Sequence, residues 1–282
     1  MKVLTSIAML ALVCAGCGDK AASPVTGTFD SPGSAAVEFA EAVRAGDRAR
    51  LAVILGPDSD MLVNAGDAVQ GGNERLAFLQ AYDSQRVLVP SGDDAFILEV
   101  GGSRWPLSIP IVKTDGGWKF DTQASVREML LRRIGRNELA VIGTMRGIIA
   151  AQNEYKSQTG AFATRLRSTA GKKDGLYWAT AAGEPESPAG RMLAWAEAEG
   201  YAPGGEKPQP YHGYLYRRLE VKNPKNEFAI LAYPSDYRYT GIKTFMTNQD
   251  GVIYARDLDV QTADAAAAIK SFAPDESWTR EP

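Results

Sequence analysis

The stretch IGRNELAVIGTMRGIIAAQNEY, residues 134–155, predicts one long helix in the middle of the chain, around which the other elements are arranged. The surrounding segment, residues 124–157, contains no proline and no turn signal that ends a helix. Gly143 and Gly147 leave the helix surface without side chains there, which lets another element approach closely. One apolar stripe is formed by Ile134, Val141, Met145, Ile148 and Tyr155. We therefore expect the helix to bury one face and to connect two compact modules.

Residues 29–122, which precede the helix, predict a small α+β module. A helix-start signal at residues 30–32 is followed by a second expected helix over residues 48–55, and Asn73 is expected to cap a third. Strands separated by glycine and aspartate turns are expected at residues 86–90, 95–100, 104–113 and 118–121. This order of elements is similar to the NTF2-like fold, in which a curled antiparallel sheet wraps an apolar pocket. The residues interpreted as core are Trp105, Trp118 and Phe120.

Residues 123–282 predict the long helix followed by an antiparallel-sheet module. A stretch rich in glycine and proline, residues 169–210, is expected to hold a short helix over residues 189–199. The later elements are expected to be strands at residues 213–221, 228–233, 242–247 and 252–255, and a helix at 262–272. A long helix on such a sheet is similar to the heads of type IV pilins and pseudopilins. The chain has no prepilin cleavage motif and its helix is internal, so filament assembly does not follow from this likeness.

The amino-acid composition argues against several classes of function, including nucleic-acid binding and metal chemistry. The chain has 282 residues, 45% hydrophobic and 23% charged, which is typical of a globular protein with two modest domains. Its net charge of −3 makes nucleic acid an unexpected partner. With one histidine, and with its two cysteines both in the first seventeen residues, it has no Cys/His zinc pattern and no disulfide framework. We expect no metal site and no cofactor.

The first residues predict an export signal ending at residue 16. Lys2 precedes an apolar run over residues 3–13, which is too short to span a bilayer as a helix. The sequence Cys14-Ala15-Gly16-Cys17 then resembles a bacterial lipobox, in which Cys17 receives the lipid and cleavage occurs just before it. Cys14 stands where leucine is commonest. Cleavage by ordinary signal peptidase near residues 21–23 is the alternative.

Residues 17–28 are small and polar and predict a flexible tether between the lipid and the folded part. Acyl chains such as palmitate on Cys17 provide the expected contact with the lipid bilayer. In enterobacterial sorting an acidic residue directly after the cysteine favours inner-membrane retention, and here that position is Gly18. The sequence therefore favours the outer over the inner membrane, on the periplasmic side.

Many separated motifs carry a family resemblance from about residue 29 to the end of the chain. They include GKKDGLYW at residues 171–178, GEPESP at 183–188, PYHGY at 210–214 and DGVIY at 250–254. With these motifs the chain resembles the bacterial envelope proteins grouped as domain-of-unknown-function family 2950. The resemblance implies an envelope protein and supplies no activity.

His212 is the only candidate for imidazole catalysis. A hydrolase needs it beside a carboxylate and a nucleophile such as Ser168 or Ser187, but the chain contains no Gly-x-Ser-x-Gly elbow. We interpret His212 as a structural residue at the start of a strand. A glycosidase pair or a hard-cation site is conceivable among the acidic residues, but none shows calcium-loop spacing, and we interpret them as turn residues. They are Asp174, Glu184, Glu186, Asp236 and Asp250.

Two further groups of side chains have competing interpretations. One is an aromatic group that either fills a loop-rich core, the interpretation we favour, or stacks on sugars: Tyr177, Trp178, Trp195, Tyr201, Tyr211, Tyr214 and Tyr216. The other is a set of arginines interpreted as solvated rather than as a headgroup site: Arg132, Arg133, Arg136, Arg165 and Arg167. We expect a lipid-anchored envelope protein that binds or scaffolds an envelope protein or glycan. An envelope hydrolase using His212 is the alternative.

Overall fold

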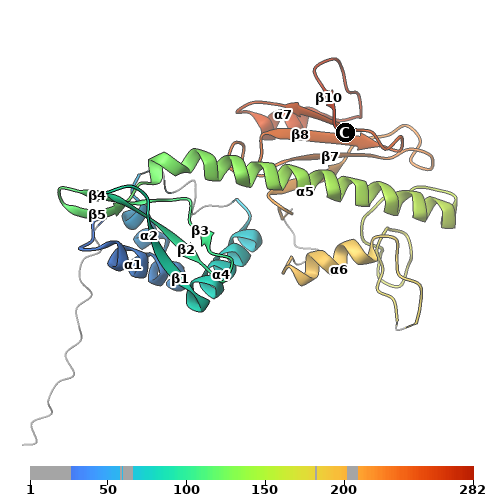
Figure 1. Cartoon of the computed structure of the whole chain (residues 1–282). Helices are drawn as coiled ribbons and strands as arrows, with labels where there is room; N and C mark the ends of the chain where they lie inside the picture. Colours follow the sequence, from blue (N-terminus) through green and yellow to red (C-terminus); the bar gives the residue numbers. More distant parts are fainter. Residues whose placement is uncertain (1–26, 58, 60–65, 182, 202–208) are drawn as a thin grey trace, which may run out of the picture.

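A computed structural model describes residues 27–57, 59, 66–181, 183–201 and 209–282 (Figure 1). In these ranges the chain forms six helices and two antiparallel sheets, which confirms the α+β class. The likenesses to NTF2-like proteins and to pilin heads stay predictions. The expected signal peptide, Cys14, Cys17 and the tether up to residue 26 lie outside the described residues.

Local capping explains where the N-terminal helices begin. The helices are α1 (Pro32–Ala45), α2 (Arg48–Leu55) and α4 (Ala68–Ser84). The Ser31 hydroxyl accepts the N–H of Ser34 at 3.0 Å, and the Asp47 carboxylate accepts the N–H of Arg50 at 2.9 Å. Each cap satisfies a backbone donor that the first helical turn leaves unpaired. Both helices therefore begin where the sequence predicts.

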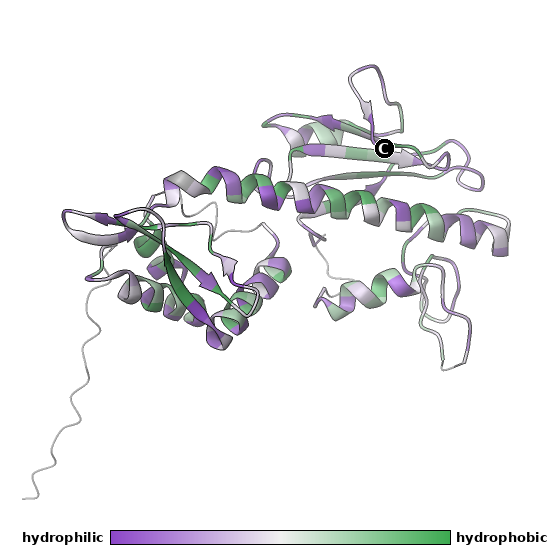
Figure 2. Cartoon of the chain, in the orientation of Figure 1, coloured by the Kyte–Doolittle hydropathy of each residue, from purple (hydrophilic) through white to green (hydrophobic). Residues whose placement is uncertain are grey.

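The N-terminal sheet carries the core of the first module. Its strands are β1 (Arg86–Pro90), β2 (Ala95–Val100), β3 (Trp105–Pro106), β4 (Ile111–Thr114) and β5 (Gly117–Phe120). They pair in the order β1-β2-β4-β5, and β3 pairs with β2. The three helices bury Phe39, Ile54 and Leu79 in one cluster with Leu98 and Ile111 of the sheet. Figure 2 shows apolar residues along these strands.

Helix α5 (Thr122–Thr159) is the long helix, with 38 residues. It leads to α6 (Gly190–Ala198) and to the second sheet, which consists of β6 (Tyr214–Arg218), β7 (Ala229–Pro234), β8 (Lys243–Asn248), β9 (Ile253–Asp257) and β10 (Thr279–Arg280). Strands β6 to β9 form a meander, and the sheet order is β10-β9-β8-β7-β6. Helix α7 (Thr262–Ala268) follows β9.

Both faces of the second sheet are covered. On one face, Val141 and Met145 of α5 pack against Phe245 and Ile230. On the other, Ala266 of α7 belongs to a cluster that also holds Leu231, Met246 and Trp278. Neighbouring residues of β7 and β8 thus point to opposite clusters, as the period of a strand requires. The middle of the apolar stripe that predicted α5, namely Val141, Met145 and Ile148, contacts this sheet.

Three predictions in the first module are wrong in detail. Helix α4 begins at Ala68 rather than after Asn73, because Asp67 caps it. The strand expected over residues 104–113 is split into β3 and β4, and the proline preceding β4, Pro110, has no N–H for a sheet ladder. Trp105 is 65% exposed, because β3 is a two-residue edge strand that pairs only with β2.

Among the described residues, no helix is both long enough and apolar enough to cross a lipid bilayer. Helix α5 has the length but carries charged residues throughout, which Figure 2 shows as purple segments between the apolar ones.

Candidate functional site

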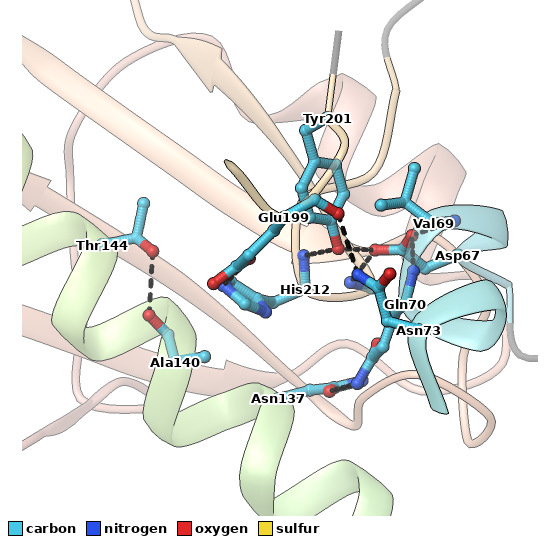
Figure 3. A network of polar contacts seen from close by, with 11 residues as sticks. Asp67, Val69, Gln70, Asn73, Asn137, Ala140, Thr144, Glu199, Tyr201 and His212 are labelled. Carbon is cyan, nitrogen blue, oxygen red and sulfur yellow. Dashed lines mark hydrogen bonds and ion pairs between the residues drawn. The ribbon is translucent and has the colours of Figure 1, made fainter. Parts of the chain in front are cut away.

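A network of buried polar contacts lies where the two modules meet, beside the middle of α5 (Figure 3). Its members come from the start of α4, from α5, from the end of α6 and from the turns before β6 and β8. We call this network the junction. The residues that form it are Asp67, Gln70, Asn137, Tyr201, His212, Gly213 and Thr240.

Asp67 is the centre of the junction. Its side chain is 2% exposed, and its Oδ1 accepts the N–H groups of Val69 and Gln70, both at 3.1 Å. Its Oδ2 accepts the hydroxyl proton of Tyr201 at 2.8 Å and the N–H of Gly213 at 3.0 Å. Four donors therefore satisfy one buried carboxylate, which offsets the cost of removing it from water. Two of them lie more than 130 residues away, so the helix cap also joins the modules.

Asn137 of α5 makes the second link. It is 1% exposed, its Nδ2 donates to the carbonyl of Thr240 at 2.9 Å, and its Oδ1 accepts from Gln70 Nε2 at 3.0 Å. Asn73 Nδ2 donates to the carbonyl of Glu199 at 2.8 Å. Each of these side chains forms a hydrogen bond between elements that are far apart in the sequence. They hold α4, α5 and the C-terminal module in one arrangement.

The backbone at residues 212 and 213 is fitted closely to this network. His212 has φ +50° and Gly213 has φ +75°, so both lie in the left-handed region. A Cβ atom on Gly213 would lie 2.7 Å from Asn137 Nδ2 and 2.8 Å from the Cβ of Thr240. Glycine is therefore required at position 213 by both conformation and space.

Two tyrosines flank the histidine, the buried Tyr201 and the half-buried Tyr211. The ring of Tyr201 packs edge-to-face on Tyr211 with 4.8 Å between centroids. Burial and the Asp67 carboxylate hold the pKa of Tyr201 well above its usual range, and burial raises the pKa of Tyr211 to about 12. The Tyr201 hydroxyl thus stays protonated at neutral pH and donates to Asp67. Its oxygen accepts the backbone N–H of His212 at 3.3 Å.

The imidazole of His212 is 26% exposed and lies on the edge of the junction. Its Nε2 is 3.5 Å from a carboxylate oxygen of Glu199, and its ring centroid is 4.2 Å from that of Tyr211. The distance to Glu199 exceeds the ~3.2 Å expected of a direct general-base contact. The sequence-based interpretation of His212 as a residue at the start of a strand agrees with its position just before β6.

The structure does not bring His212 together with either candidate nucleophile. The Ser168 hydroxyl accepts the N–H of Gly175 at 2.9 Å, within its own loop. Ser187 lines a different cleft with Trp178. Within the described ranges, the polar and ring contacts of the imidazole are with Glu199 and the two tyrosines.

The acidic residues considered as a pair or a cation site lie in separate places. Asp174 accepts the N–H and hydroxyl of Thr169 at 2.7 and 2.8 Å, which lowers its pKa. Asp250 accepts from Asn248 in the β8–β9 turn at 3.0 Å, and Glu186 pairs with Arg191 at 3.2 Å. Glu184 accepts the N–H of Ala181 at 3.4 Å, and Asp236 lines the cleft beside Asp67. The described part of the chain contains no group of three or more such side chains that could hold a metal ion.

A cleft of about 700 Å³ adjoins the junction on the side of the N-terminal module. Apolar side chains line it from α1, α2 and the loop before β4, including Phe39, Leu51 and Ile109. Asp67 and Asp236 lie at its edge, and burial raises the pKa of Asp236. Its size lies in the range of small-molecule sites, about 300–1,000 Å³.

A family comparison matches almost the whole described chain. The family described as "Protein of unknown function (DUF2950)" matches residues 26–280, so both modules, α5 and the junction fall within it. The chain belongs to the DUF2950 family. No curated protein and no solved structure matches the chain. The DUF2950 assignment agrees with the resemblance that the sequence motifs carry.

The predictions about the aromatic group and the arginines hold for some members and fail for others. Tyr201 and Tyr214 of the aromatic group are buried, Tyr177, Trp178, Tyr211 and Tyr216 are half-buried, and Trp195 is 69% exposed and therefore not a core residue. Four of the arginines form exposed ion pairs. Arg133, expected to be solvated, is 7% exposed because it lies one helical turn before the buried Asn137.

Sequence analysis missed Asp67 and Asn137. An aspartate directly before a helical stretch is a capping signal, so Asp67 was open to detection as a cap. The partners that join either residue to another part of the chain lie more than 60 positions away, which no local pattern reveals.

Proposed function

We propose that this chain is a lipid-anchored protein of the bacterial cell envelope with a non-catalytic binding or scaffolding role. The observation that carries the proposal is the junction. Its buried carboxylate, Asp67, accepts two hydrogen bonds that cap α4 and two that join the modules, and its histidine contacts no nucleophile among the described residues. The lipobox-like residues 14–17 support an anchor at Cys17, and Gly18 favours the outer membrane.

The shape of the molecule supports a scaffolding role. Phe29 pairs with Trp118 at 2.7 Å, so the chain that follows the expected tether joins the fold near the start of α5. The 38 residues of α5 rise about 57 Å along the helix axis. A rigid helix of this length holds the C-terminal module and the loops around α6 away from the anchored end (Figure 1).

Lipid anchoring is tested by labelling cells with an acyl precursor and separating membranes from soluble protein. We expect wild type and Cys14→Leu to be labelled and membrane-bound, because leucine is the commonest residue at that lipobox position. Cys17→Ser is expected to lose the label and the membrane association. Labelled, membrane-bound Cys17→Ser protein would contradict the proposed anchor.

The second candidate is an envelope hydrolase, favoured by the Glu199 carboxylate beside the partly exposed His212. Overproduction of wild type and of His212→Asn in cells, followed by chromatography of cell-wall fragments, separates the two functions. Asparagine tolerates the left-handed backbone at position 212, so the variant tests chemistry rather than folding. We expect identical fragment profiles, and a change produced by the wild type alone would favour the hydrolase.

A further inference from the structure

A second cleft lies at the far end of α5 from the N-terminal module. Residues 177–180 and the helix α6, residues 190–195, border this space of about 440 Å³. Leu176 and Leu193 belong to a cluster with Ala151 and Tyr155 of α5 that supports both walls. We call this cleft the distal groove. Figure 1 places α6 and the adjoining loops beside the C-terminal half of α5.

Two indole rings line the distal groove, one exposed to solvent and one packed against the core. Trp195 is 69% exposed, although it lies on a packed helix. Trp178 packs against the cluster of Leu176 and Leu193, so its ring is held in place. A large exposed ring beside a fixed one offers two aromatic faces on which a flat ligand can stack.

The same groove contains polar atoms without partners. The indole N–H of Trp178 and the hydroxyl of Ser187 are buried and make no hydrogen bond with any described residue. Ser187 is only 4% exposed and lines the groove. Leaving buried donors unpaired costs free energy, so such groups point to a ligand that pairs with them. The ligand needs hydroxyl or carbonyl groups next to an apolar face.

A basic cleft of about 380 Å³ adjoins the distal groove and shares residues 177–179 with it. Arg167, Lys172 and Lys173 line this cleft. The ammonium of Lys173 lies 5.4 Å from the centre of the Trp178 ring. Neither lysine forms an ion pair with a described carboxylate, so positive charge remains available beside the indole.

We propose that the distal groove binds an anionic glycan. The carbon–hydrogen faces of the sugars stack on Trp195 and Trp178, and their hydroxyls pair with the Trp178 N–H and the Ser187 hydroxyl. Carboxylates or phosphates of the glycan contact Lys172 and Lys173. This inference rests on the proposed envelope location, where such polymers occur.

The position of the groove suits a polymer beyond the bilayer. From Thr122 to Ala151, the α5 residue in the cluster beneath the groove, the helix rises about 44 Å. The groove therefore lies far from the end of the fold that the expected tether reaches. An acyl anchor and a glycan contact can act at the same time without competing for surface.

The test is a tryptophan-fluorescence titration of the full-length protein in detergent with three soluble glycans. Peptidoglycan strands supply carboxylates, phosphorylated lipopolysaccharide core supplies phosphates, and a chitin oligosaccharide supplies neutral N-acetylated sugars. We expect binding of at least one anionic glycan, weaker binding of the neutral one, and weakening with salt. Whichever anionic glycan binds more tightly identifies the source.

Trp195→Ala is expected to weaken binding roughly tenfold, and Lys172→Gln with Lys173→Gln several-fold. The matched control is Trp105→Ala, because Trp105 is a similarly exposed tryptophan in the other module. The control is expected to bind as the wild type does. Thermal unfolding of each variant checks that the fold is intact.

Three results would overturn the proposal. They are no binding of any glycan, equal loss in Trp105→Ala and Trp195→Ala, or equally tight binding of an unglycosylated acidic peptide such as polyglutamate. Failure of acyl labelling at Cys17 would contradict the anchor alone and leave this titration valid.

Discussion

The junction and the distal groove lie along the same helix and differ in how far their buried polar groups are hydrogen-bonded. At the junction, Asp67 accepts four hydrogen bonds and both ends of the Asn137 amide are paired, while Gln70 Oε1 has no partner among the described residues. In the distal groove, neither the Trp178 N–H nor the Ser187 hydroxyl has a hydrogen-bond partner in the described part of the chain. Paired groups fix one arrangement of the chain, whereas unpaired ones favour a ligand that completes them.

The same contrast distinguishes aromatic residues that stabilise the fold from those that are available to a ligand. Tyr201 is buried in the junction and donates to a carboxylate, which makes it part of the fold. Trp195 is 69% exposed beside a cleft and lies outside the core clusters, so its removal is expected to leave the core unchanged. We therefore expect substitutions in the junction to reduce stability and substitutions in the groove to reduce binding.

The largest expected loss of stability follows Asp67→Ala. The substitution removes a helix cap and leaves the Tyr201 hydroxyl and the Gly213 N–H without an acceptor, which costs about 3–4 kcal/mol in free energy of unfolding. Asp47→Ala removes only the cap of α2 and is expected to cost about 1 kcal/mol. Urea denaturation measures both. Equal losses would show that Asp67 acts as an ordinary cap.

Gly213→Ala is expected to cost about 2–3 kcal/mol, because it combines a left-handed backbone with a Cβ atom 2.7 Å from Asn137 Nδ2. Gly251→Ala is the matched control. Its φ is +77°, but the nearest atom to its Cβ, Ile149 Cγ2, is 3.9 Å away, so only the backbone strain of about 1 kcal/mol applies. The same urea experiment compares them, and a control as unstable as Gly213→Ala would contradict the close fit.

Tyr201→Phe is expected to cost about 1–2 kcal/mol by removing the donor to Asp67. The effect depends on pH, because the folded state raises the pKa of Tyr201 above its ordinary value of 10.0. The contribution is complete below pH 10.0 and is lost as the pH rises above it. The difference in stability between wild type and Tyr201→Phe should therefore shrink in alkali. A difference that grows above that pH would reverse the assigned sign.

The smallest effect is expected for Arg136→Gln. Arg136 pairs with Glu74 at 3.0 Å across the two modules, but its side chain is 64% exposed. An ion pair that water reaches contributes at most about 0.5 kcal/mol, and salt weakens it. Thermal unfolding at low and high salt measures this. A loss as large as that of Tyr201→Phe would mean that the surface of the junction matters as much as its buried part.

The elements that could be predicted from the sequence are those fixed by nearby residues, such as helix caps and a repeating apolar stripe. Helices α1 and α2 begin beside Ser31 and Asp47, which accept donors three residues ahead. Helix α5 was predictable because its apolar stripe repeats over many turns. The start of α4 has a capping signal in Asp67, but Gly71 and Gly72 interrupt the helical pattern just after it and obscure that start.

The candidate site was only half predictable. Tyr201, Tyr211 and His212 stand close together in the sequence and attract attention by residue type. Asp67, which accepts the hydroxyl proton of Tyr201, is 134 residues away from it, and only tertiary packing brings the two together. The exposure of Trp195 could not be predicted either, because a helical pattern shows which residues share a face of the helix but not whether another element covers that face.

The central claim is that the junction makes one structural unit of the two modules, and scanning calorimetry tests it most directly. For the wild type we predict a single transition whose calorimetric and van't Hoff enthalpies agree. For Asp67→Ala we predict two resolved transitions, one for each module. Two transitions in the wild type, or a single unshifted transition in Asp67→Ala, would contradict the claim.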